Sequence, residues 1–589
     1  MIVPMKKVHI VVQKKDVVSA LESLRDLGVV HVEHQDELTG QQLARRREAV
    51  KMIQEVLDIL KTVKHTCEQE DLYDWTDLGT GILKNQADIE HIKEEMVKRQ
   101  ALMVQWEPWG DFNPADFIAL EKSGVYVRLC EIFKSDLNKV PSGVIIQEIS
   151  SSKGLVRCVA ISREPVRLPF ESVTLPAMGL REMRSRQEAD KIKIEQFQKE
   201  IFDSAKYIRS LEDMLVRERN VLQFEEVEKG MREEESLEIL KGYVPIDKEN
   251  DVRRMAKEEQ WGLLVEKPST ADVVPTVIRN PKWVDIIKPL FAFINVLPGY
   301  RELDVSLVFL IFFSIFFGIL IGDAGYGLIF FLLTLFAQKK LKNKVENQAP
   351  FILMYVLSAC AIIWGILTGA VFGTLLLGKI VKPIIFWLTE NKNVQLVCFL
   401  LGAIHLTIAH LWRLLMRIPA VFSALAELGW IIVIWGAFFL ANVMVIDRML
   451  LGLDIERAFM IVGVGAVLII ADIISRPKDG IAVGLVLSFF SFISAFTDVV
   501  SYIRLFAVGL AGVAVANSFS EIALGLGFNS FLNGLLTSLI LVVGHLFNVV
   551  LCCFGILVHG LRLNVLEFSG HLGLEWAGVK YEPFKKVNK

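Results

Sequence analysis

Two arginines, Arg504 and Arg562, are the residues whose type and setting point most directly to chemistry. No charged side chain lies between Arg504 and Glu521, and none lies in residues 522–561, which lead up to Arg562. A charge at the centre of a lipid bilayer costs roughly 2.5–3.5 kcal/mol, so such a residue usually faces protein or a water-filled cavity and serves a function. Two arginines on the last two apolar stretches therefore predict an ion path.

The surroundings of the two arginines differ. Arg504 is predicted near the middle of a long span, on a helical face of mostly small side chains that allows a second helix to approach closely. This face comprises Ser501, Ala507, Val508, Ala511, Ala514 and Ser518. Arg562 lies nearer the end of its span, so an arginine that extends to the membrane interface remains an alternative there. His559, Gly555 and Asn548 share its face and form a polar track.

Further polar side chains of the same stretches are candidates for lining an ion path. Asp498 is expected either to line a half-channel or to pair with a neighbouring side chain. Glu521 and Glu567 lie near the ends of spans, where a role in ion access and a solvated position are equally compatible with the sequence. Three of the histidines in the apolar part, His405, His410 and His545, are expected to be packing residues rather than ligands.

The elements that position these residues follow from composition. Only a small share of the 64 Lys and Arg and the 67 Asp and Glu residues falls within residues 303–572. A helix needs about 20 apolar residues to cross a bilayer. Hydrophobic runs predict about eight spans, near 305–321, 325–338, 351–375, 394–412, 428–446, 458–475, 481–524 and 531–569. The second span is short, and the last two are long, which predicts that they are tilted.

Loop charges predict how these spans are oriented. Lys and Arg are more numerous in segments 339–344, 413–417, 476–478 and 580–589 than in the alternate loops. Positive charge favours the cytoplasmic side of a membrane. The first residues lack the apolar core of a signal peptide. With an even number of spans, both termini are expected in the cytoplasm.

Residues 1–300 are expected to form a cytoplasmic α/β arm, and residues 301–589 a transmembrane ion-translocating domain. Alternating side chains predict strands at 8–12, 29–33, 125–133, 144–149 and 155–161. Asp16 and Gly28 as end signals predict a helix at 16–27, which joins the first two strands in a βαβ unit. Spacings of three and four residues predict long helices with an a/d-like seam. The strongest seam comprises Ile194, Phe197, Ile201, Ile208, Leu211, Leu215 and Leu222.

The predicted fold class is therefore an α/β cytoplasmic domain, in which long coiled-coil-like helices join two small lobes, followed by a polytopic α-helical membrane domain. An ordinary α/β domain with surface helices is the alternative for the first part. The sequence contains neither a Gly-x-x-x-x-Gly-Lys-[Ser/Thr] loop nor a Gly-x-Gly-x-x-Gly turn after a strand. Seven cysteines without Cys-x-x-Cys argue against a disulfide framework or a zinc site. We expect no catalytic residue, cofactor or metal, and any nucleotide would be hydrolysed by another chain.

From residue 240 onward, a series of motifs carries a family resemblance. They are Leu240-Lys-Gly-Tyr-Val-Pro245, Leu297-Pro-Gly-Tyr-Arg-Glu302, Phe316-Phe-Gly-Ile-Leu-Ile-Gly-Asp-Ala-Gly-Tyr-Gly327, Trp364-Gly-Ile-Leu-Thr-Gly-Ala-Val-Phe-Gly373, Ser501-Tyr-Ile-Arg-Leu-Phe-Ala507 and Arg562-Leu-Asn-Val-Leu-Glu-Phe568. The chain resembles, in the identity and order of these motifs, the large membrane stator subunit of rotary V-type and A-type ATPases, called subunit a or subunit I.

The resemblance implies a role in ion translocation. In this family a ring of rotor subunits carries buried carboxylates, and the stator supplies two half-channels separated by a cationic barrier. Arg504 and Arg562 match the barrier positions, and arginine suits them because it stays protonated and its fork matches a carboxylate. Arg504 has no carboxylate on its own face, so its partner is expected from the rotor. The candidate half-channel residues are Asp498, Ser501, Ser518, Glu521, Asn548, His559 and Glu567.

The implied partners are the rotor proteolipid ring of c/K type, peripheral stalk subunits of E/G type, the ATPase head indirectly, and the lipid bilayer of the cell (inner) membrane, with no nucleic acid. The ion would be H⁺ or Na⁺, moved by ATP hydrolysis or driving ATP synthesis. One alternative is a secondary transporter with a cytoplasmic regulatory domain, but residues 303–446 and 447–572 show no clear repeat of the kind such transporters carry. Another is a membrane anchor without transport, which would not need Arg504.

Overall fold

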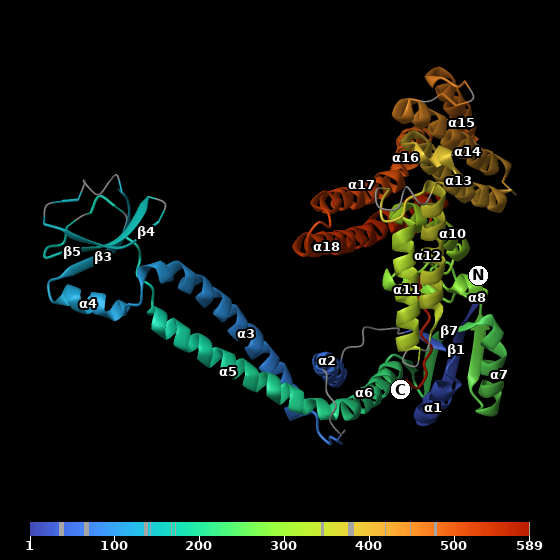
Figure 1. The fold of residues 1–589 in the computed structure, drawn as a ribbon. Coiled ribbons are helices and arrows are strands. Elements are labelled where there is room, and N and C mark those ends of the chain that lie inside the picture. Colours follow the sequence, from blue (N-terminus) through green and yellow to red (C-terminus); the bar gives the residue numbers. More distant parts are fainter. Residues whose placement is uncertain are drawn as a thin grey trace. The chain divides into compact units, whose positions relative to one another are not determined.

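The computed structural model consists of two compact units, and each is described by itself (Figure 1). The first unit comprises Met1–Val8, Gly242–Met255 and Leu263–Pro583, and the second comprises His9–Lys241, Ala256–Gly262 and Phe584–Lys589. The structure describes all residues except 34–39, 64–69, 135–139, 142, 153, 167, 171, 343–344, 346, 375–381, 419, 448, 451, 476–479 and 588–589. The units follow packing rather than chain order, and a domain border at residue 300 stays a prediction.

Four long helices of the second unit pack as two antiparallel pairs (Figure 1). Their bounds are Gln41–Thr62 (α2), Thr76–Trp106 (α3), Leu180–Ser204 (α5) and Ile208–Lys229 (α6). Arg99 near the end of α3 binds Asp190 near the start of α5 at 2.6 Å, whereas Asn85 binds Glu200 at 2.8 Å, so these helices run in opposite directions. Ion pairs join α2 to α6 in the same antiparallel sense.

The apolar seam predicted from residue 194 to residue 222 lies on two of these helices rather than one. A 3-10 turn, Ala205–Tyr207, separates α5 from α6. Ile201 before the turn and Leu211 and Leu215 after it are buried in one core with side chains of α2 and α3. The seam is therefore confirmed as a packing surface. The turn in its middle divides it between two helix pairs, α3 with α5 and α2 with α6.

A three-stranded antiparallel sheet forms a lobe with the ends of α3 and α5, and its strands lie in the order β3-β5-β4. The elements are Pro114–Lys122 (α4), Tyr126–Phe133 (β3), Ile145–Ser152 (β4) and Leu155–Ser162 (β5). All three strands confirm the predicted ones. Cys130 and Cys158 face each other across β3 and β5, and burial raises the pKa of the Cys158 thiol to about 11. Trp106 and Leu180, from the ends of α3 and α5, complete the core of the lobe.

The first predicted strands belong to a sheet with the strand order β2-β7-β1-β8, and β6 pairs with β7. The elements are Met5–Gln13 (β1), Val17–Leu27 (α1), His31–Glu33 (β2), Arg232–Glu234 (β6), Leu237–Pro245 (β7), Glu249–Glu258 (α7) and Gly262–Glu266 (β8). The predicted strand, helix and strand at the start of the chain are confirmed, and the helix ends at Gly28 in the left-handed conformation. However, β7 lies between β1 and β2, because local periodicity does not determine which strands pair.

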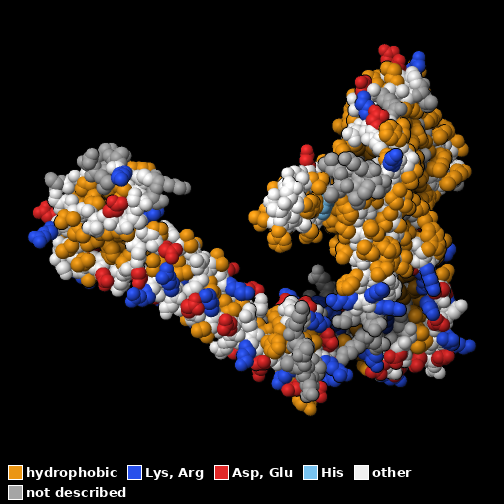
Figure 2. All heavy atoms as spheres, in the orientation of Figure 1, with side chains coloured by type: hydrophobic (Ala, Val, Ile, Leu, Met, Phe, Trp, Pro, Cys, Tyr) orange, Lys and Arg blue, Asp and Glu red, His pale blue; other side chains and the backbone are white. Residues whose placement is uncertain are grey.

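Apolar helices make up most of the first unit. Its elements are Pro275–Thr276 (β9), Lys282–Asp285 (α8), Lys288–Phe293 (α9), Ser306–Ile321 (α10), Ala324–Leu341 (α11), Ala349–Thr368 (α12), Asn391–Arg417 (α13), Val421–Ala441 (α14), Ile455–Ser475 (α15), Ile481–Ser501 (α16), Ile503–Leu526 (α17), Phe531–Gly555 (α18), Ser569–Leu572 (α19) and Val579–Lys580 (β10). Hydrophobic side chains cover the visible surface of these helices (Figure 2). Such a surface is suited to lipid rather than water.

The number of membrane spans differs from the predicted eight. In the described part of the chain, six helical segments are long and apolar enough to cross a membrane, or up to seven if the bent pair α10 and α11 counts as one span. The predicted spans near 305–321 and 325–338 are the two arms of this pair, which bends by 120°. The hydrophobic runs predicted the helices correctly, but they did not reveal that these two form a short, sharply bent unit.

Both chain ends lie on the same side of these helices. The Met1 ammonium donates to the carbonyl oxygen of Arg279 and pairs with Asp304 at 2.5 Å. At the other end of the chain, β10 pairs with β9, and Gly578 N donates to Leu297 O at 3.0 Å. Residues 275–304 thus contact both ends, so the number of crossings between them is even. A re-entrant α10 and α11, or two crossings by them, satisfies this condition, whereas a single broken span does not.

Asp323 holds the bend between α10 and α11. Its Oδ1 accepts from Gly325 N at 2.8 Å and from Phe372 N at 2.9 Å, and its Oδ2 accepts from Gly373 N at 2.7 Å. The preceding Gly322 has a φ of 64°, which a residue without a side chain adopts readily. The Asp323 carboxylate therefore caps α11 and ties the bend to the connection that follows α12.

Candidate functional site

Arg504 lies at the start of α17, directly after the break that separates it from α16. Its Nε donates to the carbonyl oxygen of Ser501 at 2.9 Å, and its Nη2 donates to Glu567 Oε1. Glu567 belongs to the last apolar segment, and its side chain is 5% exposed, against 21% for Arg504. The nearly buried carboxylate of this same chain therefore holds the arginine.

Arg562 reaches the same carboxylate oxygen from its own helical segment. Its Nε lies 3.4 Å from Glu567 Oε1, and its side chain is 56% exposed. In an α-helix, residues five apart point about 140° away from each other. The backbone is π-helical at Ile556–Gly560 and Leu563–Phe568, and π-helical hydrogen bonds bring residues five apart above one another. This local geometry turns Glu567 toward Arg562, so one carboxylate bridges both arginines.

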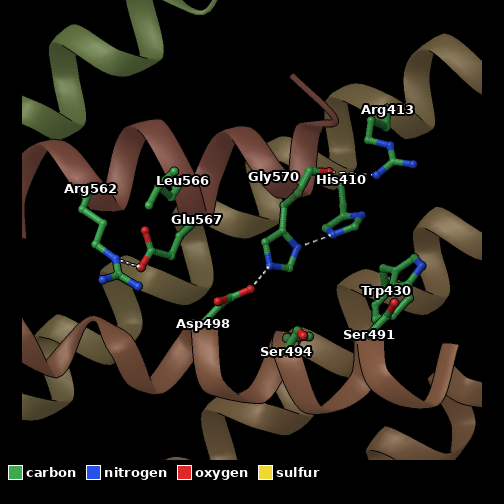
Figure 3. Close-up of a pocket in the computed structure, with 12 residues that line it drawn as sticks. His410, Arg413, Trp430, Ser491, Ser494, Asp498, Arg562, Leu566, Glu567 and Gly570 are labelled. Carbon is green, nitrogen blue, oxygen red and sulfur yellow. Dashed lines mark hydrogen bonds and ion pairs between the residues drawn. The ribbon is translucent and has the colours of Figure 1, made fainter. Parts of the chain in front are cut away.

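A cavity of about 520 Å³ opens beside this cluster (Figure 3). It is lined by His410, Arg413, Trp430, Ser491, Ser494, Ala495, Asp498, Arg562, Leu566, Glu567, Gly570 and His571. Figure 3 shows Glu567 from one helix and Asp498 from the facing helix directed into the same space. Most of the lining side chains are polar or charged, which suits water and ions.

An unbroken series of titratable side chains begins at one wall of this cavity and continues into the protein. His571 Nε2 lies 3.0 Å from Asp498 Oδ2, and His571 Nδ1 lies 2.9 Å from His410 Nε2. His410 Nδ1 in turn lies 2.7 Å from Glu427 Oε2. Glu427 is 1% exposed, and its other oxygen, Oε1, pairs with Arg413 at 3.0 Å. The series therefore connects the last turn of α16 to the end of α13 and the start of α14.

A second cavity of about 320 Å³ lies at the other end of α13. It is lined by Ile319, Gly322, Trp364, Thr368, Ala370, Thr374, Leu388, Thr389, Asn391, Val394, Leu505, Phe506, Gly509, Leu510, Val513 and Asn517. Asn391 begins α13, whereas Arg413, which lines the first cavity, lies near its end. Along the segment of Arg504, residues before it line the first cavity and residues after it line the second.

Beside Arg504, a groove of about 440 Å³ separates α17 from α18. Ala507 and Ala511, from the predicted small-residue face, line it and are exposed. His559 also lines the groove. Asn548 lines it as well, but its side chain is buried and donates to the Tyr326 hydroxyl at 2.9 Å and to the Gly512 carbonyl at 2.7 Å. The small-residue face of α17 is thus open in this chain, as docking of another helix requires.

The structure brings together part of the predicted site. Arg504, Arg562 and Glu567 are in direct contact, and Asp498 lines the same cavity as Arg562 and Glu567. Ser501 contacts this group through its carbonyl oxygen on Arg504 and its hydroxyl on the Asp498 carbonyl. Asn548 and His559 belong to the groove between α17 and α18. Ser518 and Glu521 lie farther along α17, where both are exposed.

Sequence reasoning missed two residues that line the first cavity, His410 and His571, and the buried Glu427 behind them. His571 and Glu427 were not singled out, and His410 was predicted to be a packing residue, whereas it contacts both of them. The sequence contained one signal: Glu427 lies at the edge of an apolar run shortly after Arg413 and Arg417. A carboxylate so placed requires cationic partners at the same membrane depth.

Comparison with known proteins gives a consistent assignment. No protein-family model matches the chain. V-type ATP synthase subunit I 1 of Treponema pallidum is 30% identical over 637 residues and is covered completely, as is this chain. V-type ATP synthase subunit I of Borreliella burgdorferi is 27% identical over 620 residues with complete coverage of both chains. A-type ATP synthase subunit I of Pyrococcus abyssi is 30% identical over 338 residues, which cover 54% of this chain and 49% of that protein.

A search of solved structures found the cytoplasmic N-terminal domain of subunit I, homolog of subunit a, of V-ATPase. It is 12% identical, covers 44% of this chain and 99% of its own, and has a TM-score of 0.22. A score this low carries no argument about the fold. The assignment therefore depends on the sequence relatives that match over the complete chain.

Proposed function

Because the chain belongs to the family of V-type ATP synthase subunit I, we propose that it forms the two ion half-channels of a rotary ATPase against the rotor ring. The ion, H⁺ or Na⁺, would move in exchange for ATP hydrolysis or synthesis on other subunits. The observation that carries this proposal is the position of the two cavities at opposite ends of α13, with Arg504 between the residues that line them. A continuous pore would not separate the cavities with a fixed cation.

Charge and geometry indicate how the barrier works. A rotor carboxylate that enters the open groove between α17 and α18 meets Arg504, whose positive charge favours the ionised form of a nearby carboxylate. The bound ion is therefore released into one cavity. An arginine cannot pass a proton because it stays protonated. The carboxylate is reloaded from the other cavity only after rotation has moved it away from Arg504.

The second unit is proposed to anchor the peripheral stalks. Its lobe exposes large hydrophobic side chains on α4 and on the sheet, with Ile118 58%, Phe133 60% and Ile145 68% exposed. Figure 2 shows hydrophobic side chains gathered over this lobe, whereas charged side chains dominate along the long helices. Exposed apolar patches on a polar domain commonly bind another protein. Stalk helices with a complementary apolar face are the partner that this family supplies.

The proposed location is the cell membrane, with both termini in the cytoplasm. Two observations support it: the chain ends lie on one side of the apolar helices, and Arg413 and Arg417 lie at the end of α13, where Arg413 contacts His571 near the C-terminal end of the chain. Positively charged loops favour the cytoplasmic face.

Copurification and transport test the proposal together. The tagged full chain, extracted from its native membrane in mild detergent, should bring with it a proteolipid ring and ATPase heads. Proteoliposomes of this complex should take up an ion when ATP is added, and Arg504→Ala should abolish the uptake. The matched control is Arg457→Ala, an exposed arginine that donates to the Gly452 carbonyl. Solute transport by the chain alone, without ring or heads, would establish the secondary transporter instead.

A further inference from the structure

We propose that the ion moved through the first cavity is a proton, and that it travels along a side-chain relay of Asp498, His571, His410 and Glu427. This inference rests on the proposed function and specifies its ion. The relay consists of three consecutive contacts of 3.0, 2.9 and 2.7 Å, each between two groups that titrate. Both ring nitrogens of each histidine take part. An imidazole bound on both sides can accept a proton at one nitrogen and release one from the other.

Counting protons shows what this arrangement requires. A carboxylate and an unprotonated imidazole nitrogen are both acceptors, so each of the three contacts needs one proton between its partners. Two neutral histidines supply only two protons. The third contact therefore requires one additional proton, shared by the four groups. The geometry is therefore that of a chain of four groups that holds one excess proton.

The transfer steps balance without any other reactant. A proton that arrives on Glu427 passes to His410 Nδ1, and the proton of His410 Nε2 passes to His571 Nδ1. The proton of His571 Nε2 then passes to Asp498, which faces the cavity with Arg562 and Glu567. Each step breaks one O–H or N–H bond and forms one on the next group. The reverse sequence moves a proton in the opposite direction.

Glu427, the end of the relay farthest from the first cavity, lies next to exposed side chains. Glu427 also pairs with Arg413 and Arg417, which are 26% and 43% exposed. Trp430 stacks on His410 with ring centroids 6.0 Å apart, and Arg413 Nη1 donates to the His571 carbonyl at 2.8 Å. The stacking restrains the His410 ring, and the hydrogen bond holds the backbone of His571. Hard cations prefer oxygen ligands, so two imidazoles in series suit a proton and not a sodium ion.

Ion identity and a histidine substitution test this inference. In proteoliposomes of the complete ATPase, ATP should drive acidification that a protonophore abolishes and that does not require Na⁺. His410→Gln and His571→Gln, whose amides form hydrogen bonds but do not relay protons, should each lower this uptake at least tenfold. His91→Gln is the matched control, because this exposed histidine lies on α3 of the other unit. Added imidazole should restore part of the uptake in His571→Ala, since the cavity admits it.

The possible results separate the relay from the proposed function. ATP-driven uptake of ²²Na⁺ that His410→Gln leaves unchanged would overturn the proton relay while leaving a rotary ion channel. Proton uptake at the normal rate in both glutamine variants would also overturn the relay. If the assembled wild-type complex hydrolyses ATP but moves neither ion, the proposed function itself is wrong. Loss of uptake in both variants, together with rescue by imidazole, would support the relay, because a merely structural role would not respond to a diffusible base.

Discussion

Removal of the Arg504 guanidinium should destabilise the chain, and a second substitution should restore stability without restoring transport. Arg504→Ala leaves the Glu567 carboxylate, which is 5% exposed, with Arg562 as its charged partner at 3.4 Å. Loss of one partner of a buried ion pair typically costs about 3–5 kcal/mol. Arg562 is 56% exposed, and an exposed partner contributes up to about 1 kcal/mol. We therefore expect Arg504→Ala to lower the free energy of unfolding by about 2–4 kcal/mol.

The double variant Arg504→Ala/Glu567→Gln removes the buried charge that causes this loss. Its destabilisation should fall below about 1 kcal/mol, because a neutral amide is far less costly to bury than an unpaired carboxylate. Denaturation of the detergent-solubilised full chain measures stability, and ATP-driven ion uptake by the assembled complex measures transport. Both variants should lose nearly all transport, whereas Arg457→Ala should resemble the wild type in both assays. A double variant that is as unstable as Arg504→Ala, or that transports ions, would refute this account of Glu567.

Three further expectations can be checked separately. Arg562→Ala should reduce ion uptake severely but less completely than Arg504→Ala, and Arg562→Lys should recover part of the uptake. An equal or larger loss for Arg562→Ala would contradict the expectation that Arg504 is the more important of the two arginines. Single cysteines at Ala507 or Ala511, in the open groove, should crosslink to the rotor helix that bears the carboxylate, whereas crosslinks solely to other stator helices would show that this face is oriented differently. The pKa of Cys158 is raised to about 11, so this thiol should resist alkylation at pH 8 in the folded lobe. The lobe should also lose stability as the pH rises from about 9 to about 11, because the thiol ionises first in the unfolded chain. Rapid labelling of the folded protein at pH 8 would contradict this.

Local patterns predicted the elements of the arm, whereas their pairing required the structure. Strands near 125–133 and 155–161 were predictable because alternation is a property of a few neighbouring residues. The insertion of β7 between β1 and β2 was not, because some 200 residues separate these strands in sequence and no local signal specifies their register. The sequence shows a glycine, Gly322, at the bend of α10 and α11, but it does not show the bend itself. The Asp323 contacts that hold it to Phe372 and Gly373 were not visible in the sequence.

The candidate site was predictable to the extent that it depends on charge in an apolar sequence. Arg504 and Arg562 stand out for that reason alone. Glu567 was recognised only as a residue near a span end, because an α-helical projection directs it away from Arg562 and the π-helical turn reverses this. His410 and His571 lie 161 positions apart, and only tertiary packing brings their rings within 2.9 Å. A relay whose residues come from different helices therefore cannot be predicted from the periodicity of a single helix.

The charge balance of the arginine cluster limits how the proposed rotor subunit could bind to it. Two guanidinium groups share one carboxylate, so the cluster keeps one positive charge in the free chain. Without Glu567 it would keep two, at a depth where each uncompensated charge is costly. With Glu567 in place, a single carboxylate of the proposed rotor would neutralise the cluster, and a second would leave it negative. In the proposed function, the bridging carboxylate would thus lower the cost of holding the barrier charge before a rotor docks, and it would favour engagement of one rotor carboxylate at a time. Glu567 has this effect only because the π-helical turn places it between the two arginines, so the backbone irregularity at Leu563–Phe568 is as necessary to the barrier as the arginines themselves.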